Sequence, residues 1–247
     1  MKFDSIIIMP TYNEKDNIEK IIKAVFELPK VFHILVVEDN SPDGTANIVK
    51  NLMLEFPDRL FIEERQGKQG LGTAYIHGFK WALKNGYDYI FEMDADFSHQ
   101  PAYLIDLYSA CFNGIDLAIG SRYINGVNVV NWPMNRVLMS YFASAYVRGI
   151  TGMTLRDTTA GFKCYRRAVL DAINLDAIKF VGYAFQIEMK YITHLLGFEI
   201  KEVPIIFYDR TVGESKMSSK IFKEAILGVI NMRINKLFGK KYYRKTL

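Results

Sequence analysis

Residues 89–96 read YIFEMDAD, a short apolar run that ends in two aspartates, Asp94 and Asp96. Because side chains alternate along an extended chain, both carboxylates point to the same side of the predicted strand. Residues 1–120 repeat this arrangement: short β-branched runs end in polar residues, and segments of helical periodicity separate the runs. Such a rhythm is typical of βαβ units, so the sequence predicts an α/β fold with a mainly parallel central sheet flanked by helices.

Polar segments follow four of the predicted strands at the point where each strand ends. The strands are expected at Ser5–Met9, His33–Val37, Leu60–Glu63, Tyr89–Met93 and Leu117–Gly120. The polar segments after the first four are Pro10–Glu14, Glu38–Thr45, Arg65–Ala74 and Asp94–Asp96. Because the carboxyl ends of parallel strands lie on one edge of a sheet, we expect these segments to converge on a single crevice, where open α/β sheets bind ligands.

The second half of the chain has a different rhythm, which indicates an extension of one domain. Helices are expected at Arg136–Ile150 and Ala184–Leu196, a polar loop at Asp157–Arg166, a strand at Glu199–Ile206 and a final amphipathic helix at Ser218–Leu237. We therefore divide the chain into a domain at residues 1–216 and a C-terminal amphipathic helix with a basic tail at residues 217–247. No run of about 18 apolar residues is present, so no membrane-spanning segment is expected.

The composition excludes several classes of protein. Of the 247 residues, 50% are hydrophobic and 23% are charged, which is typical of globular rather than disordered or fibrous proteins. The two cysteines, Cys111 and Cys164, lack metal-ligand spacing and no secretory signal is visible, so we expect a cytoplasmic protein with both thiols reduced. The histidines lack zinc-ligand spacing and no Gly-x-Ser-x-Gly motif occurs, which argues against zinc enzymes and α/β-hydrolases.

The two aspartates of residues 94–96 are the strongest candidate for a metal site. Two carboxylates that face one way repel each other unless a cation joins them, and a hard divalent ion such as Mg²⁺ takes one or two protein carboxylates together with phosphate oxygens of a substrate. The pair would then hold a nucleotide diphosphate and stabilise it as a leaving group. The alternative is a solvated loop, or a cap for the helix after Ser98.

Two further loops suit a nucleotide. Asp39, at the end of the second strand, is placed to accept hydrogen bonds from a nucleobase, whereas Asp43 is as plausible as a helix cap as it is as a ligand. Lys68 lies in a glycine-rich segment before a helix, a setting that suits phosphate binding. The spacing fits neither a Walker loop nor a dinucleotide fingerprint, so a turn for close packing is the alternative.

Cations of the second half occur in motif-like settings, at Arg122, Arg136, Arg210 and Lys216. Transfer between a diphosphate and a phosphate acceptor gathers negative charge, which guanidinium groups neutralise through bidentate hydrogen bonds. Each arginine taken singly is better explained by a surface ion pair, so the argument rests on the arginines together.

Taken together in chain order, these motifs resemble the polyprenol-phosphate (dolichol-phosphate) mannosyltransferase branch of glycosyltransferase family 2. The matching segments are Pro10–Glu14, Val37–Thr45, Lys68–Ala74, Met93–Pro101, Gly120–Tyr123, Trp132–Arg136 with Ser140, Asp157–Arg166, Gly182–Glu188 and Asp209–Lys216. The resemblance implies a GT-A fold, Mg²⁺ or Mn²⁺ as cofactor, and inverting transfer of mannose from GDP-mannose to a polyprenyl monophosphate.

The same resemblance implies roles for individual residues. It implies catalytic roles for Asp94, Asp96, Arg122 and Arg210, with Asp94 and Asp96 as metal ligands. The implied nucleotide-sugar-binding residues are Pro10, Tyr12, Glu14, Glu38, Asp39, Asp43, Lys68, Asp94, Ala95 and Asp96. The implied acceptor-phosphate residues are Arg122, Arg136, Ser140, Arg210 and Lys216.

The sequence departs from the family where the second strand ends in Glu38-Asp39-Asn40 rather than in paired aspartates, and where residues 123–127 lack a glycine cluster. Another donor such as UDP-glucose, another acceptor, and a non-catalytic nucleotide- or membrane-binding module remain alternatives. Many relatives carry C-terminal membrane helices, whereas no such helix is expected in this sequence. We therefore expect the chain to reach the cytoplasmic face of a membrane through its final helix and basic tail, or through a membrane-anchoring partner. Ordinary packing of that helix on the core is equally plausible, and no nucleic acid partner is expected.

Overall fold

The computed structural model describes residues 4–182, 184–209, 226–234 and 244, and these contain a seven-stranded sheet with the order β3-β2-β1-β4-β7-β5-β8. The strands are β1 (Ser5–Thr11), β2 (His33–Glu38), β3 (Leu60–Glu64), β4 (Tyr89–Glu92), β5 (Leu117–Ser121), β7 (Lys163–Arg166) and β8 (Ile200–Pro204). All of them run parallel except β7, which pairs antiparallel with β4 and β5. The mainly parallel α/β sheet expected from the sequence is confirmed.

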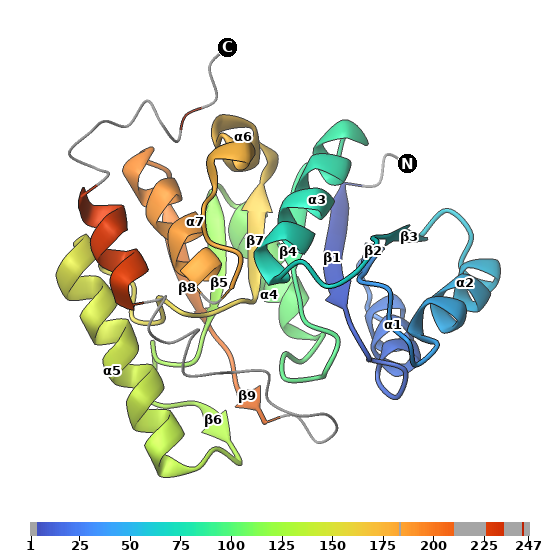
Figure 1. Ribbon diagram of the computed structural model, residues 1–247, viewed down its shortest axis with the longest axis horizontal. Helices are drawn as coiled ribbons and strands as arrows, with labels where there is room; N and C mark the ends of the chain where they lie inside the picture. Colours follow the sequence, from blue (N-terminus) through green and yellow to red (C-terminus); the bar gives the residue numbers. More distant parts are fainter. Residues whose placement is uncertain (1–3, 183, 210–225, 235–243, 245–247) are drawn as a thin grey trace.

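Helices cover both faces of this sheet (Figure 1), and the residues of β1 alternate between the two cores. Ile7 and Met9 pack with α1 (Ile18–Phe26), α2 (Thr45–Glu55) and α4 (Tyr103–Phe112). Ile6 and Ile8 pack on the opposite side with α3 (Leu71–Lys84), α6 (Arg167–Ala172) and α7 (Ala184–Leu195). Strand β1 is therefore buried on both faces, as its unbroken apolar sequence requires.

Strand β7 corrects the expectation of a polar loop at Asp157–Arg166. Residues 163–166 form a strand between β4 and β5, and Lys163 lies opposite Glu92 in the register. The apolar alternation that identifies a strand is interrupted by Lys163, which is fully buried because its ammonium group pairs with Glu92. The pairing partner is 71 residues away, so the local sequence carries no sign of it.

The second half also forms α5 (Met134–Thr151), a short 3₁₀ helix (Leu175–Ala177) and a two-stranded parallel ladder of β6 (Val129–Val130) with β9 (Phe207–Tyr208). The helices expected at Arg136–Ile150 and Ala184–Leu196 and the strand expected at Glu199–Ile206 are confirmed as α5, α7 and β8.

The final amphipathic helix expected at Ser218–Leu237 falls partly outside the described residues. Residues 226–234 are helical and lie beside α5 (Figure 1), where the Tyr146 hydroxyl donates to the carbonyl of Ile226 over 3.1 Å. Val229 and Met232 are buried, so one side of this helix packs on the core. Within residues 4–182, 184–209 and 226–234, no helix is long and apolar enough to cross a bilayer.

The contact between α3 and β1 generates a stability prediction. A Cβ atom on Gly78 would lie 2.3 Å from Cγ2 of Ile8, which is closer than side chains approach each other. We expect Gly78→Ala to lower the free energy of unfolding by ~1–3 kcal/mol, because the buried contact has to be pushed apart. Chemical denaturation of the purified variant measures this change.

Gly149 of α5 supplies the matched control, since apart from the adjoining residues and helix backbone nothing lies within 4 Å of a Cβ placed there. We expect Gly149→Ala to leave the protein as stable as the wild type or more stable by up to ~1 kcal/mol. A Gly78→Ala variant as stable as Gly149→Ala would contradict the packing described here.

Candidate active site

A pocket of about 480 Å³ opens at the carboxyl edge of the parallel strands. The ends of β1, β2 and β4 contribute Pro10 and Tyr12, Asp39, and Asp94 with Asp96. The glycine-rich segment and the start of α3 also reach the pocket, through Lys68, Gly70, Leu71 and Ala74. The predicted convergence of the four polar segments on one crevice is therefore confirmed.

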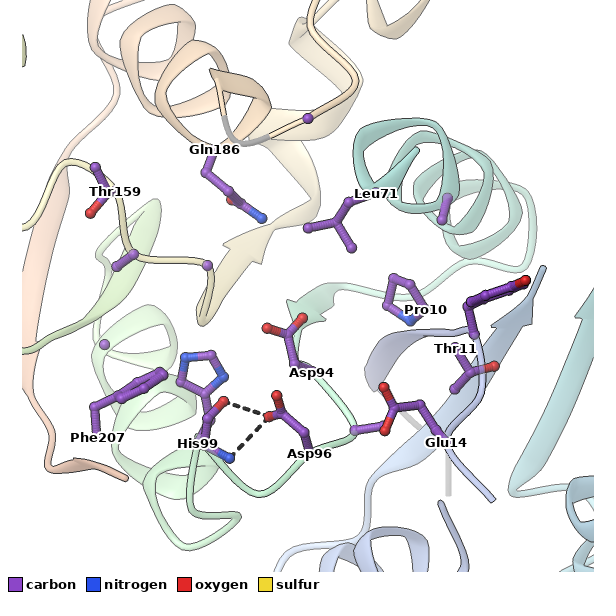
Figure 2. Close-up of a pocket in the computed structure, with 18 of the residues that line it drawn as sticks. Pro10, Thr11, Glu14, Leu71, Asp94, Asp96, His99, Thr159, Gln186 and Phe207 are labelled. Atoms are coloured by element: carbon purple, nitrogen blue, oxygen red, sulfur yellow. Dashed lines mark hydrogen bonds between the residues drawn. The ribbon is translucent and has the colours of Figure 1, made fainter. Parts of the chain in front are cut away.

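Asp94 and Asp96 lie side by side at the centre of the pocket (Figure 2). The backbone N–H and the hydroxyl of Ser98 both donate to Oδ1 of Asp96, over 3.1 and 2.6 Å. This turn places Phe97 at a φ of 59°, in the left-handed region that costs a non-glycine residue energy. Asp94 accepts a 3.2 Å hydrogen bond from the Tyr75 hydroxyl, and burial together with the charge of Asp94 raises the pKa of Tyr75 well above its usual value. The hydroxyl therefore stays a donor, and both carboxylates are oriented.

The donor atoms of this pair fit a hard divalent cation. Both ligands offer carboxylate oxygens, which suit Mg²⁺ and Mn²⁺ better than softer metals. In the part of the chain that the structure describes, no cluster of three or more His, Cys, Asp or Glu side chains is arranged to hold a metal ion. A cation bound here would complete its shell with water and with oxygens of a ligand.

Asp39 is held at the pocket wall by a bidentate ion pair that the sequence did not reveal. Nε and Nη2 of Arg65 donate to Oδ1 and Oδ2 of Asp39 over 2.6 and 2.7 Å, and Nη1 donates to the Thr73 hydroxyl over 2.8 Å. Both charged side chains are about nine-tenths buried, with 8% of each exposed. The Arg65 contact ties β2 to α3 and fixes the direction in which Asp39 faces the pocket.

Two of the expected nucleotide residues, Glu38 and Asp43, lie outside the set that lines the pocket. Glu38 accepts hydrogen bonds from the backbone N–H and the hydroxyl of Ser41. Asp43 accepts from the backbone N–H and hydroxyl of Thr45 and from the backbone N–H of Lys15. Burial alone would raise the pKa of Asp43, but these hydrogen bonds hold it below the usual value. Both residues stabilise the loop behind the pocket, which favours the capping alternative for Asp43.

Arg122 lines the pocket, but its guanidinium group is already engaged. Nε and Nη2 donate to the two carboxylate oxygens of Asp157 over 2.7 and 2.6 Å, and Nη2 also donates to the Thr159 hydroxyl over 2.8 Å. Asp157 is fully buried, which would raise its pKa, yet Arg122 holds that pKa below the usual value. The pair ties the end of β5 to the loop that carries Thr159, a link absent from the sequence-based expectations.

Of the other residues expected to bind the acceptor phosphate, the structure places only Arg136 in the pocket lining among the residues it describes. Arg136, in the first turn of α5, lines the pocket. Its Nη1 donates to both carboxylate oxygens of Asp209 over 2.8 and 2.9 Å. Its Cζ lies 4.1 Å from the ring centre of Trp132. Ser140, one turn later, is half-buried and is not among the lining residues. Arg210 and Lys216 lie outside the described residues.

Several residues that line the far side of the pocket were not among the expected site residues. His99 is buried between Phe162 and Phe207, and burial lowers its pKa to about 4, so the imidazole is neutral. Gln186 comes from α7, where its neighbours are mostly apolar. The available signal was the alternation of polar Gln186, Glu188 and Lys190 with apolar residues in the first half of the helix.

Glu188 shapes the pocket without touching it. Its Oε2 accepts hydrogen bonds from the backbone N–H groups of Lys179 and Phe180, over 3.1 and 3.0 Å. Burial raises the pKa of Glu188 to about 7, although the two N–H groups oppose that shift. The hydrogen bonds fix the segment before α7, which brings Val181 and Gly182 to the pocket wall.

Comparison with known proteins identifies the family. The family model for glycosyl transferase family 2 matches residues 6–173. The polyprenol monophosphomannose synthase of Mycolicibacterium smegmatis is 45% identical over 225 residues, which cover 91% of this chain and 85% of the relative. The undecaprenyl-phosphate mannosyltransferase of Micrococcus luteus is 45% identical over 224 residues and 91% of each chain.

Solved structures with little sequence identity share the fold. Glucosyl-3-phosphoglycerate synthase from Mycobacterium tuberculosis, solved with Mn²⁺ and UDP, has a TM-score of 0.65 at 17% identity over 96% of this chain and 81% of that one. A mannosyltransferase from Pyrobaculum calidifontis, solved with GDP-Man and Mn²⁺, has a TM-score of 0.56 at 14% identity over 98% and 73%. The expected GT-A fold is confirmed, and the chain belongs to glycosyltransferase family 2.

Proposed function

We propose that this glycosyltransferase moves mannose from GDP-mannose to a polyprenyl monophosphate, with inversion at the anomeric carbon. The observation that carries the proposal is the pair of oriented carboxylates, Asp94 and Asp96, at the centre of the pocket. The pocket lining includes acidic Glu14 and Asp39 as well as basic Arg122 and Arg136. Two relatives with 45% identity are named for mannose transfer to polyprenyl or undecaprenyl phosphate. A solved neighbour that binds GDP-Man supports the choice of nucleotide.

The donor would lie along the carboxyl edge of the sheet. Pro10, Tyr12, Glu14 and Asp39 surround the nucleoside end, and Arg65 fixes Asp39 for hydrogen bonds to the base. The Lys68 ammonium lies 5.0 Å from the ring centre of Tyr12, close to the path of the diphosphate.

The metal would be held by Asp94 and Asp96, with Ala95 between them in the pocket lining. When bound, Mg²⁺ or Mn²⁺ supplies positive charge that stabilises the departing diphosphate. Solved neighbours that contain Mn²⁺ support a divalent metal. The hydrogen bonds from Ser98 and Tyr75 keep both carboxylates in place before the ligand arrives.

The acceptor needs no strong general base in this reaction. The second pKa of a phosphate monoester is about 6, so the lipid phosphate is largely dianionic near neutral pH. One of its oxygens attacks the anomeric carbon in line and forms the new bond. The bond between that carbon and the diphosphate oxygen breaks, and its electron pair stays on the departing diphosphate. His99, the histidine in the pocket lining, is a weak base because burial lowers its pKa to about 4, which agrees with a reaction that needs no strong general base.

The acceptor phosphate would bind where α5 begins. Arg136 presents its guanidinium group at this end of the pocket, and the Arg122–Asp157 pair supports the adjacent wall. Ser140, Arg210 and Lys216 belong to the same proposed acceptor site.

An unusually apolar surface adjoins the acceptor end. Met134, Leu138, Met139, Tyr141 and Phe142 of α5 are exposed, and Leu227, Ile230 and Ile234 of the neighbouring helical segment are exposed as well. We call these side chains the α5 surface. Large exposed apolar patches mark interaction sites, and a lipid acceptor has to be taken from a membrane. We propose that the α5 surface lies on the cytoplasmic face of the membrane, with the C-terminal extension of residues 217–247, and that a membrane-anchoring partner is the alternative occupant.

Removal of the metal site tests the function. We expect Asp96→Asn to lower mannosyl transfer by at least ~100-fold, because a neutral amide binds a divalent cation poorly and leaves the diphosphate uncompensated. The assay follows GDP release and lipid-linked mannose formation by purified protein, and chelation of divalent metal should abolish both until Mg²⁺ or Mn²⁺ is added back.

Asp106→Asn, an exposed position on α4, is the matched control and should retain wild-type activity. Near-normal transfer by Asp96→Asn would overturn the role of this pair. A preference for UDP-glucose in a panel of nucleotide sugars would support the alternative donor, and nucleotide binding without turnover would support a binding module.

Membrane contact generates a separate prediction, for which the chain offers a matched pair. Phe142 on α5 and Phe112 at the end of α4 each have 63% of their surface exposed. We expect Phe142→Asp to weaken binding to phospholipid vesicles by about tenfold or more, because it removes an apolar side chain from the bilayer contact. Vesicle co-sedimentation measures the binding, and Phe112→Asp should bind like the wild type. Equal binding by the two variants would contradict the assignment of the α5 surface.

A further inference from the structure

The ion pair between Arg136 of α5 and Asp209, the residue directly after β9, lies at the acceptor end of the pocket and is open to solvent. Of the two side chains, 26% of Arg136 and 25% of Asp209 are exposed. In the neighbouring pair, only 5% of Arg122 and none of Asp157 are exposed. An ion pair in contact with water contributes little energy, whereas a buried pair is costly to break. The Arg136–Asp209 pair can therefore be exchanged for a contact with another anion.

This ion pair uses only part of the Arg136 guanidinium group. Nη1 donates to both oxygens of Asp209, over 2.8 and 2.9 Å. In the part of the chain that the structure describes, no other carboxylate lies within ion-pair distance of Arg136. A guanidinium group carries five N–H donors in a planar fork, which fits carboxylate and phosphate oxygens. Because Arg136 lines the pocket, its other donors can reach an anion bound there.

Other contacts would keep both residues in place if the ion pair opened. Cζ of Arg136 lies 4.1 Å from the ring centre of Trp132, which holds the guanidinium group against an aromatic face. Trp132 makes a T-shaped contact with Phe207 of β9, with ring centres 5.2 Å apart. The backbone N–H of Asp209 donates to the carbonyl of Val130 over 3.0 Å. Rotation of the Asp209 side chain is therefore enough to open the pair, without movement of the β6–β9 ladder.

The proposed reaction changes the charge of the group that would bind at Arg136. The acceptor is a phosphate monoester, which is largely dianionic near neutral pH because its second pKa is about 6. Transfer of the sugar converts it into a phosphodiester with a single negative charge. Attraction to a cation scales with the charge of the anion, so the product is held less strongly than the acceptor. A carboxylate that competes for the guanidinium group lowers the affinity for both and leaves the product only weakly bound.

We propose that Asp209 competes with the acceptor phosphate for Arg136. Its carboxylate pairs with the guanidinium group while the acceptor site is empty, rotates away when a phosphate dianion arrives, and pairs again as the phosphodiester leaves. The same competition keeps weakly bound anions, such as the phosphodiester groups of phospholipids, from occupying Arg136. This inference rests on the proposed function, since it takes the ligand of Arg136 to be the acceptor phosphate. Asp209 acts through Arg136, so it is a positioning residue rather than a catalytic one.

Asp209→Asn tests the competition, because this change removes the charge and keeps the size of the side chain. We expect Kd for farnesyl phosphate to fall by about two- to fivefold, the factor that corresponds to a solvent-exposed ion pair. KM for farnesyl phosphate should fall by a similar factor, and inhibition by the mannosylated product should become stronger. Titration calorimetry and steady-state kinetics with purified protein measure these changes. Unchanged or weaker binding of farnesyl phosphate would overturn the inference, because an aspartate that only orients Arg136 supports binding.

Asp171→Asn is the matched control for the change in net charge. Asp171 forms a 3.0 Å ion pair with Arg167 on α6, has 44% of its side chain exposed, and does not line the pocket. This variant changes the net charge by the same amount as Asp209→Asn, and it should bind farnesyl phosphate like the wild type. An equal gain in affinity in the two variants would be a general effect of charge and would contradict competition at Arg136.

A double-mutant cycle separates competition from a structural role. In an Arg136→Gln background, the additional change Asp209→Asn should leave kcat/KM for farnesyl phosphate unchanged, because the guanidinium group for which the two anions compete is gone. An effect of Asp209→Asn that persists in this background would contradict the inference.

If Asp209→Asn does not fold, a crystal structure of wild-type protein with farnesyl phosphate decides the question. Phosphate oxygens on Arg136, with the Asp209 carboxylate turned away, support the inference. An intact Arg136–Asp209 pair beside the bound phosphate overturns it.

The outcomes separate this inference from the proposed function. Wild-type protein that transfers no mannose to a polyprenyl monophosphate contradicts the proposed function before any variant is made. Wild-type transfer, with binding of farnesyl phosphate unchanged by Asp209→Asn, contradicts only the role of Asp209.

Discussion

The site depends on one buried ion pair, between Glu92 of β4 and Lys163 of β7. Burial lowers the pKa of Lys163, and the adjacent Glu92 opposes that shift. Removal of one partner from such a pair leaves an uncompensated buried charge, at a cost of about 3–5 kcal/mol. The pair therefore fixes the register of the antiparallel strand against β4, and with it the position of Asp94 two residues further along the chain. The same carboxylate accepts a hydrogen bond from Gln186, so Glu92 connects the edge that carries Asp94 and Asp96 to α7.

A second constraint is that three arginines near the pocket are each engaged by an aspartate. Arg65 pairs with Asp39, Arg122 with Asp157 and Arg136 with Asp209. The first two pairs are buried and bidentate, so they cannot reorient without a large loss of energy. Side chains fixed in this way need little rearrangement when a charged ligand arrives, which is the condition for effective electrostatic stabilisation by preorganised groups.

The sequence predicted the parts of this site that follow from local pattern. The apolar runs of β1, β2 and β4 are unambiguous, and polar residues at their ends had to meet because parallel strands end on one edge. The features that the sequence could not predict depend on contacts between side chains far apart in the chain. Arg122 meets a carboxylate 35 residues away and Arg136 one 73 residues away, so their engagement was invisible. Lys163 concealed β7 for the same reason, and Gln186 acquires its orientation from Glu92, 94 residues earlier.

The central claim is that Asp94 and Asp96 hold a divalent cation and, through it, the diphosphate of a nucleotide sugar. Anomalous scattering from crystals grown with Mn²⁺ and GDP measures this most directly. We expect one manganese peak between the two carboxylates, in contact with the diphosphate. Nucleotide bound elsewhere, with no metal at Asp94 and Asp96, would contradict it.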